Sequence, residues 1–331
     1  MKLCIYGAGA VGGHLAARFA AQFPPGGGQH ELSLVCRGPQ LEAIKRNGVT
    51  LHRGDEVYTG RPAVATDDPS SLPPQDIVLV TLKANALPAA AASIETLLAR
   101  DGVAVFATNG IPWWWNKGLD GPQTPLPLLD PDGQLWSRLK DRTLGCVIYS
   151  PNEVIEPGVI RSNIKDRWMI GEPDGTDSPR AHRVADLLQS ANIRGVATTD
   201  IRYETWYKLL INYALNPVAA LTRLPTANMN HNPDVVALRK QIMLEVIDIA
   251  LACGTDLRGK IDLDEAVTPT KRSGSNRASM LQDVLANRPL EVEAILGQTV
   301  ALARQHGVHA VRCELLLGLM RGLAESMTLS S

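Results

Sequence analysis

The stretch that decides the fold opens the chain and reads Met1-Lys-Leu-Cys-Ile-Tyr-Gly7-Ala-Gly9-Ala-Val-Gly12-Gly13. Residues 2–6 predict a short buried strand, and residues 11–23 carry Ala, Leu and Phe at helical spacing. In the Gly-x-Gly-x-x-Gly between them, the first glycine makes a tight turn, the second lets the backbone approach a pyrophosphate, and the third lets the helix pack closely. Phosphates would then rest on the N–H groups of the first helical turn. We therefore predict a dinucleotide-binding turn, with an ordinary strand–helix turn as the alternative; its residues are Gly7, Ala8, Gly9, Ala10, Val11 and Gly12.

The residue after the second predicted strand, residues 31–36, indicates which dinucleotide binds. A carboxylate there would bond the ribose hydroxyls of NAD, whereas an arginine suits the additional phosphate of NADP. The chain has Arg37 at this point, and Glu31 lies at the other end of the strand. The sequence therefore favours NADPH/NADP+, with a solvated surface charge as the alternative for Arg37.

Two further apolar runs, residues 76–83 and 102–110, are bounded by turns and separated by an alanine-rich helix at about residues 87–100. Such runs are typical of parallel strands covered on both faces, and their alternation with helices predicts a doubly wound α/β sheet. Lys83 and Asn109 fall just past the carboxyl ends of these strands, where such sheets bind ligands. We therefore predict a functional role for both, with a loop charge and a simple Asn109-Gly110 turn as alternatives.

Composition excludes several classes of protein. The 331 residues carry a formal net charge of −1, so no bulk field favours nucleic acid or an anionic membrane. No run approaches the roughly 18 apolar residues that a membrane span needs, and the N-terminus lacks a signal pattern. Five scattered cysteines without a Cys-x-x-Cys pair predict reduced thiols in a cytoplasmic protein. Seven histidines without metal-ligand spacing argue against a catalytic metal.

The chain is long enough for two domains, which we expect at residues 1–199 and 200–331. Residues 111–140 interrupt the first with Trp113-Trp114-Trp115 and a stretch crowded with Pro, Gly and Asp. These tryptophans could cover the nicotinamide or the substrate, or they could anchor a loop or pack against a partner subunit. Strands are expected at 143–150, 153–161, 166–171 and about 195–198, with a helix at about 179–190. Helices follow at about 201–222, 233–253, 276–286 and 290–327.

Lys208, Asn212 and Asn216 lie four residues apart in an otherwise apolar helical run. On a helix this spacing places the three polar side chains in a line along one face, among residues apolar enough to be buried. Burying amides without partners costs about 2–7 kcal/mol each, so the line would be tolerated where it faces a polar substrate cavity. A surface pair of Lys208 with Glu204, one turn earlier, is the alternative. Glu291 alone could simply favour a helix dipole, and Ser279 alone is an unremarkable helix serine.

Taken together, the motifs resemble the ketopantoate reductase family over nearly the full length of the chain. The resemblance rests on Gly7-Ala-Gly9-Ala-Val-Gly12, Thr81-Leu-Lys83-Ala, Asn109-Gly110, Glu204-Thr-Trp206-Tyr-Lys208, Asn212, Asn216, Ser279-Met-Leu-Gln-Asp283 and Arg288-Pro-Leu-Glu291-Val-Glu293. It implies a Rossmann-type α/β N-terminal domain and an all-α C-terminal domain with 6-phosphogluconate dehydrogenase-like helices.

The resemblance also implies roles for individual residues. Lys208 would be the general acid, and Glu291 would assist it and hold the substrate hydroxyl. Substrate contacts are implied for Asn109, Lys208, Asn212, Asn216 and Ser279, and cofactor contacts for Arg37, Lys83, Asn109 and Glu291. The chain departs from the family pattern at Pro225-Thr226-Ala227, where many members have Pro-Asn-Gly, and in its tryptophan-rich insertion.

These inferences lead to one expected activity and two alternatives. We expect NADPH-dependent reduction of 2-dehydropantoate (ketopantoate) to pantoate, in the pathway to pantothenate. The alternatives are a reductase of a different 2-oxo acid on the same fold and a non-catalytic NADP-binding sensor. The expected partners are the small-molecule 2-oxo acid and a second subunit in a homodimer, without nucleic acid or membrane.

Overall fold

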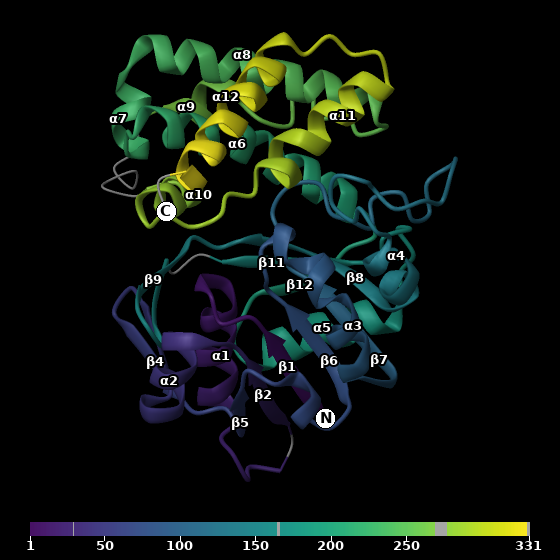
Figure 1. Cartoon of the computed structure of the whole chain (residues 1–331), viewed down its shortest axis with the longest axis vertical. Helices are drawn as coiled ribbons and strands as arrows, with labels where there is room; N and C mark the ends of the chain where they lie inside the picture. The colour runs from purple at the N-terminus through teal and green to yellow at the C-terminus, as the bar shows by residue number, and fades with distance from the viewer. Residues whose placement is uncertain (29, 164–165, 269–276, 330–331) are drawn as a thin grey trace. The chain divides into compact units, whose positions relative to one another are not determined.

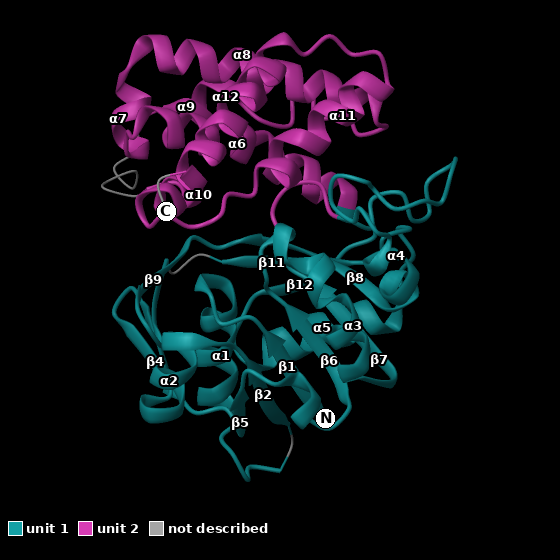
Figure 2. Cartoon of the chain, viewed as in Figure 1, with its two compact units in different colours: residues 1–108, 113–201 teal, residues 109–112, 202–331 magenta. Residues whose placement is uncertain are grey.

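The computed structural model describes residues 1–28, 30–163, 166–268 and 277–329. The chain forms two compact units (Figure 2). Unit 1 comprises Met1–Thr108 and Trp113–Ile201, and unit 2 comprises Asn109–Pro112 and Arg202–Ser331. Unit 1 is an α/β layered structure and unit 2 is helical, so the fold class expected from the sequence is confirmed.

Unit 1 is built on an eight-stranded sheet with the order β12-β11-β8-β7-β6-β1-β2-β5 (Figure 1). Every neighbouring pair is parallel except β8 with β11. The strands are β1 (Lys2–Tyr6), β2 (Glu31–Val35), β5 (Val64–Thr66), β6 (Gln75–Val80), β7 (Leu98–Phe106), β8 (Thr143–Tyr149), β11 (Arg167–Gly171) and β12 (Gly195–Ala197). Their central residues are buried, as expected for parallel strands in a layered α/β structure.

A second sheet of four strands, with the order β4-β3-β10-β9, packs on the other side of the first helix. Its strands are β3 (Val49–Arg53), β4 (Glu56–Gly60), β9 (Asn152–Glu156) and β10 (Val159–Ser162). The single strand expected at 153–161 is therefore wrong, because the chain reverses at Gly158, whose φ is +81°. Pro157-Gly158 is a turn signal inside that range, and Gly158 supplies the positive φ without a steric penalty.

Unit 1 contains the three predicted helices, one of them with a moved boundary, and two helices, α2 and α4, that were not predicted. They are α1 (Ala10–Gln22), α2 (Gly38–Asn47), α3 (Leu87–Leu97), α4 (Gln134–Leu139) and α5 (Pro179–Ser190). The short 3₁₀ helices are η1 (Pro69–Ser71), η2 (Ala84–Ala86) and η3 (Lys140–Arg142). The helix expected to reach residue 100 ends at Leu97, and β7 starts at the next residue, earlier than predicted. Pairing of Leu98 with Gln75 of β6 overrides the helical preference of this alanine-rich stretch.

The three consecutive tryptophans are buried within unit 1, each with 2% of its surface exposed. Trp113 packs edge-to-face on Phe106 of β7, with ring centroids 5.2 Å apart. Trp114 lies over Gly145 of β8, where an added Cβ would come within 2.5 Å of the indole. Aromatic rings buried in this way anchor the segment that follows β7 through apolar contact area.

A buried polar cluster joins α1 to the second sheet. His14 is fully buried, with Nδ1 2.8 Å from Oδ1 of Asn152 and Nε2 3.6 Å from Oδ2 of Asp166. Arg53 donates to the other oxygen of Asp166 at 3.1 Å. Burial lowers the pKa of His14 from 6.5 to about 4, and Asn152 and Asp166 offset only part of this effect.

The cluster predicts acid sensitivity. Because the unfolded chain binds the proton of His14 more tightly than the folded one, stability is lost as the pH falls from about 6.5 towards 4. A shift of this size corresponds to about 3 kcal/mol. In urea unfolding across that range, His14→Gln should lose less stability on acidification than the unmodified protein, whereas exposed His182→Gln should not differ from it. Equal pH slopes for all three proteins would contradict the assignment.

Unit 2 is organised around α8, which contacts α7, α9, α11 and α12. Its elements are α6 (Ile201–Thr222), α7 (Thr226–His231), α8 (Pro233–Ala252), α9 (Leu263–Val267), α10 (Ser279–Leu285), the π-helix η4 (Glu293–Gly297), α11 (Gln298–Gln305) and α12 (Val311–Leu329). The helix expected at 290–327 is wrong as one element, because Gly307 takes a φ of +67° and separates α11 from α12. Residue 276, expected to start a helix, lies outside the described residues.

Two further observations concern the described part of the chain as a whole. None of its helices is long and apolar enough to cross a membrane. Among the same residues, no group of three or more His, Cys, Asp or Glu side chains is arranged to hold a metal ion.

Candidate functional site

The glycine turn follows β1 and is fixed by contacts to both neighbouring strands. Gly7 has a φ of +108°, which only glycine adopts readily, and its N–H donates to the carbonyl of Val35 at 2.8 Å. The hydroxyl of Thr81, directly after β6, donates to the carbonyl of Gly7 at 2.8 Å. Contacts to the strands on either side therefore help to set the conformation of the turn.

The other two glycines of the motif differ in what a side chain at their position would meet. A Cβ on Gly12 would collide with the carbonyl of Gly7 and come within 2.5 Å of the Thr81 hydroxyl, so this position needs glycine for packing. A Cβ on Gly9 would meet nothing within 4 Å, so its lack of a side chain is not explained by the protein's own atoms. A phosphate that approached the backbone at Gly9 closely would need this open space.

The start of α1 has the features of an anion site. Gly9 caps the helix without a side-chain hydrogen bond, and the first turn contains no acidic residue. The N–H groups of this turn and the positive end of the helix dipole then face outward without a carboxylate to compete with a phosphate. The turn thus fits the pyrophosphate of a dinucleotide.

Gln40 supports the turn, a role that sequence analysis did not predict. Its Nε2 donates to the carbonyl of Ala8 at 2.7 Å, and its Oε1 accepts from the N–H of Gly158 at 2.5 Å. One side chain on α2 thereby links the glycine turn to the β9–β10 hairpin. The link depends on a contact between segments 118 residues apart, which no local pattern encodes.

Arg37 and Lys83 lie at the same edge of the sheet as the glycine turn. Arg37 is exposed, follows β2 and caps α2, and Lys83 is half-buried, follows β6 and caps η2. Because β1 is parallel to both β2 and β6, the carboxyl ends of all three strands share one edge. The structure therefore brings together the three cofactor-binding features that the sequence predicts for unit 1.

In unit 2, the polar line of Lys208, Asn212 and Asn216 lies on α6, a helix whose other residues are mostly buried. Lys208 and Asn212 are half-buried, and Asn216 is only 3% exposed. The three polar side chains therefore lie along a helix whose other residues are largely buried, as expected where a ligand can bind them.

The surroundings hold α6 firmly. Tyr213, fully buried, donates its hydroxyl to the carbonyl of Cys313 on α12 at 3.2 Å. Arg239, 2% exposed on α8, donates Nε to the carbonyl of Ala214 at 3.1 Å, close to Pro217 inside the helix. Burial lowers the pKa of Arg239 to about 10, which still leaves the guanidinium charged at neutral pH. Rigid support of this kind limits how far the polar line can move.

Asn109 and Glu291, 182 residues apart in the sequence, meet in unit 2. Asn109 Nδ2 donates to Glu291 Oε2 at 3.3 Å. The neighbouring N–H of Ile111 donates to the carbonyl of Ala294 at 2.8 Å, and a Cβ on Gly110, whose φ is +80°, would collide with that carbonyl. Asn109-Gly110 is thus more than a turn, because it also packs against the segment that carries Glu291 and Ala294.

Two residues named in the sequence analysis remain, Ser279 and Glu204. Ser279 starts α10 and is exposed, while Glu204, the alternative partner of Lys208, is 9% exposed on α6.

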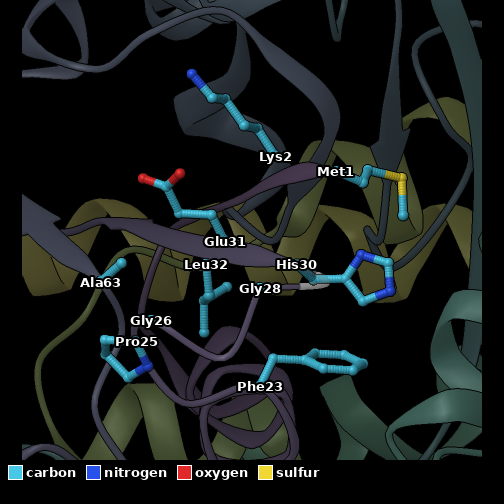
Figure 3. Close-up of a pocket in the computed structure, with 10 residues that line it drawn as sticks. All are labelled: Met1, Lys2, Phe23, Pro25, Gly26, Gly28, His30, Glu31, Leu32 and Ala63. Atoms are coloured by element: carbon cyan, nitrogen blue, oxygen red, sulfur yellow. The ribbon is translucent and has the colours of Figure 1, made fainter.

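A pocket of about 410 Å³ lies at a different place in unit 1 (Figure 3). Met1, Lys2, Phe23, His30 and Glu31 are among its lining residues. It adjoins the amino ends of β1 and β2, at the edge of the sheet opposite to the glycine turn. Ligands of doubly wound sheets bind at the carboxyl edge, so this pocket does not belong to the predicted cofactor site.

The turn and the sheet edge of unit 1 place the protein among the dinucleotide-binding proteins with a Rossmann-type sheet. Family models named "Ketopantoate reductase PanE/ApbA" and "Ketopantoate reductase PanE/ApbA C terminal" match residues 3–113 and 200–324. The chain belongs to the ketopantoate reductase family. Membership implies an oxidoreductase that works with a nicotinamide cofactor.

Individual relatives agree with this assignment. A 2-dehydropantoate 2-reductase from Mesorhizobium japonicum is 36% identical over 327 residues, covering 98% of both chains. One from Archaeoglobus fulgidus is 26% identical, covering 98% of this chain and 99% of the relative. The solved 2-dehydropantoate 2-reductase from Geobacter metallireducens has a TM-score of 0.81 at 25% identity, covering 98% and 99%. A D-mandelate dehydrogenase solved with NADH and anilino(oxo)acetate has a TM-score of 0.81 at 16% identity and covers 99% and 100%, which shows a shared fold only.

Proposed function

We propose that the protein reduces 2-dehydropantoate (ketopantoate) to pantoate with NADPH, as a cytoplasmic enzyme of pantothenate synthesis. The observation that carries the proposal is the polar line of Lys208, Asn212 and Asn216 on α6, a helix whose other residues are largely buried. Relatives named 2-dehydropantoate 2-reductase support the substrate. Turnover of ketopantoate, measured as NADPH consumption against a panel of other 2-oxo acids, tests it.

The proposed roles follow from the chemistry of each side chain. The bound cofactor supplies the hydride for the keto carbon, and negative charge grows on the keto oxygen. Lys208 stabilises that charge and delivers a proton, while Asn212, Asn216 and Ser279 orient the substrate. Glu291 accepts from the substrate hydroxyl and assists Lys208. Asn109 holds the Glu291 carboxylate through its amide, and the glycine turn, Arg37 and Lys83 bind the cofactor.

Arg37 is proposed to select NADPH over NADH through the additional phosphate. Hydrogen bonds to charged groups contribute about 1.5–3 kcal/mol, so Arg37→Ala should lower the NADPH-to-NADH ratio of kcat/KM by about 10- to 100-fold. Lys45→Ala removes an exposed cation from the last turn of α2, the helix that Arg37 caps; it is the matched control and should leave the ratio unchanged. An unchanged ratio for Arg37→Ala would assign the arginine to solvent.

A different 2-oxo acid on the same fold remains the second candidate, because the chain has Pro225-Thr226-Ala227 where many family members have Pro-Asn-Gly. Thr226 starts α7, close in sequence to the end of α6. Failure on ketopantoate with turnover of another acid would favour this candidate. NADPH binding without turnover of any acid would favour a non-catalytic sensor.

A homodimer is part of the proposal. Val311, Leu315 and Leu319 project at i, i+4 spacing from α12, with exposed fractions of 57%, 65% and 61%. An apolar stripe of this kind is typical of a protein–protein contact. A ketopantoate reductase from Staphylococcus aureus is described as dimeric. Light scattering on the purified protein tests the oligomeric state.

A further inference from the structure

A single π-helical turn interrupts unit 2 just after Glu291. It spans Glu293–Gly297, and the N–H of Gln298 donates to the carbonyl of Glu293, five residues back. Such turns are rare, occur mostly as single-turn insertions in α-helices, and are frequent at functional sites. Its position two residues from a proposed catalytic carboxylate suggests that it shapes that residue's surroundings.

An ion pair from the last helix holds the turn. Arg321 on α12 donates Nε to Glu293 Oε1 at 2.8 Å and its second terminal nitrogen to Oε2 at 2.7 Å. These hydrogen bonds raise the pKa of Arg321. A Cβ on Gly297 would collide with Glu293 Oε2, so glycine at this position leaves the space that the carboxylate occupies when it binds Arg321.

The same turn receives the segment that carries Asn109. Ala294, inside the turn, accepts the N–H of Ile111 and lies against Gly110, and Asn109 then reaches Glu291. A rotation of the turn would move the carbonyl of Ala294, and with it the distance between Asn109 and Glu291. The register of this short π-helix therefore sets the geometry of the Asn109–Glu291 contact.

We propose that Arg321 and Glu293 are positioning residues that lock the π-helical turn and thereby orient Glu291 against Asn109. The proposal rests on the catalytic role proposed above for Glu291. The side chain of Arg321 is 50% exposed and that of Glu293 37% exposed, and ion pairs this open contribute little to stability. Their bidentate geometry instead restricts the orientation of the carboxylate, which a single charge contact would not do.

The test uses the full-length protein and separates geometry from stability. Arg321→Ala should lower kcat by about 10- to 100-fold, since small displacements of a reacting group have effects of that size. The KM for NADPH should not change, and Tm should fall by no more than about 3 °C. Arg321→Lys should restore part of kcat. Gly297→Ala, which displaces the Glu293 carboxylate, should reproduce the loss seen in Arg321→Ala.

Arg304→Ala is the matched control, because Arg304 pairs with Glu314 at 2.8 Å on an exposed face of the same unit. A kcat for Arg321→Ala equal to that of Arg304→Ala would overturn the proposal. Adding Arg321→Ala to Glu291→Gln should cause no further loss, since both act through one carboxylate, and independent, additive losses would also overturn it. Full turnover by Glu291→Gln alone would instead remove the proposed role of Glu291, whereas an impaired Glu291→Gln beside an unimpaired Arg321→Ala removes only the positioning role.

Discussion

Replacing Lys208 by alanine should lower kcat for the 2-oxo acid by about 10²–10⁴-fold, the usual contribution of a positioned general acid. The loss arises because no other group proposed here can both stabilise the developing oxyanion and protonate it. The affinity for NADPH, measured by fluorescence titration in the absence of the acid, should stay within about twofold, since the proposed cofactor contacts of the turn come from unit 1.

Lys240→Ala is the control for Lys208→Ala. Lys240 lies on α8 of the same unit and pairs with Asp264 on α9, away from the α6 line. It should retain full turnover, and circular dichroism should show that both variants are folded. Turnover of Lys208→Ala equal to that of Lys240→Ala would falsify the general-acid assignment while leaving the cofactor site untouched.

Alanine at the glycine turn should weaken cofactor binding in two distinguishable ways. In Gly12→Ala the new methyl group collides with the carbonyl of Gly7, a backbone atom that cannot move aside cheaply. Overpacking of this kind costs about 1–3 kcal/mol or more, so the variant should lose both stability and NADPH affinity, the latter by more than about 100-fold. In Gly9→Ala the φ of −70° suits alanine and no protein atom lies within 4 Å of the methyl group.

Gly9→Ala should therefore keep its stability and lose only NADPH affinity, by about 10- to 100-fold, because the backbone can no longer approach a phosphate closely. Gly318→Ala on α12 is the control, since its methyl group also meets nothing within 4 Å and alanine favours the helix. Its NADPH affinity should equal that of the unmodified protein. Normal NADPH affinity in Gly9→Ala would show that the phosphates do not rest on this turn.

Much of the architecture could be predicted because it is encoded at short range. The strand–glycine–helix order gives the Rossmann start, continuous apolar runs give parallel strands, and the spacing of Lys208, Asn212 and Asn216 gives a polar helical face. One prediction failed because a longer-range contact decides the element: pairing with β6 turned the end of an alanine-rich helix into β7. Two others failed at local breaks inside a regular pattern. Gly158 turns one expected strand into a hairpin, and Gly307 divides one expected helix into two.

The sequence by itself determined the class of fold, the glycine turn and the polar face of α6, because each depends on periodicity or spacing within a few residues. Only the tertiary structure decided that residues 109–112 belong to the helical unit, that Asn109 contacts Glu291, and that Gln40 and Arg321 support the two candidate sites. These contacts join segments between 28 and 182 residues apart. Their geometry depends on how whole elements pack and, at Glu293–Gly297, on one π-helical turn that no sequence period signals.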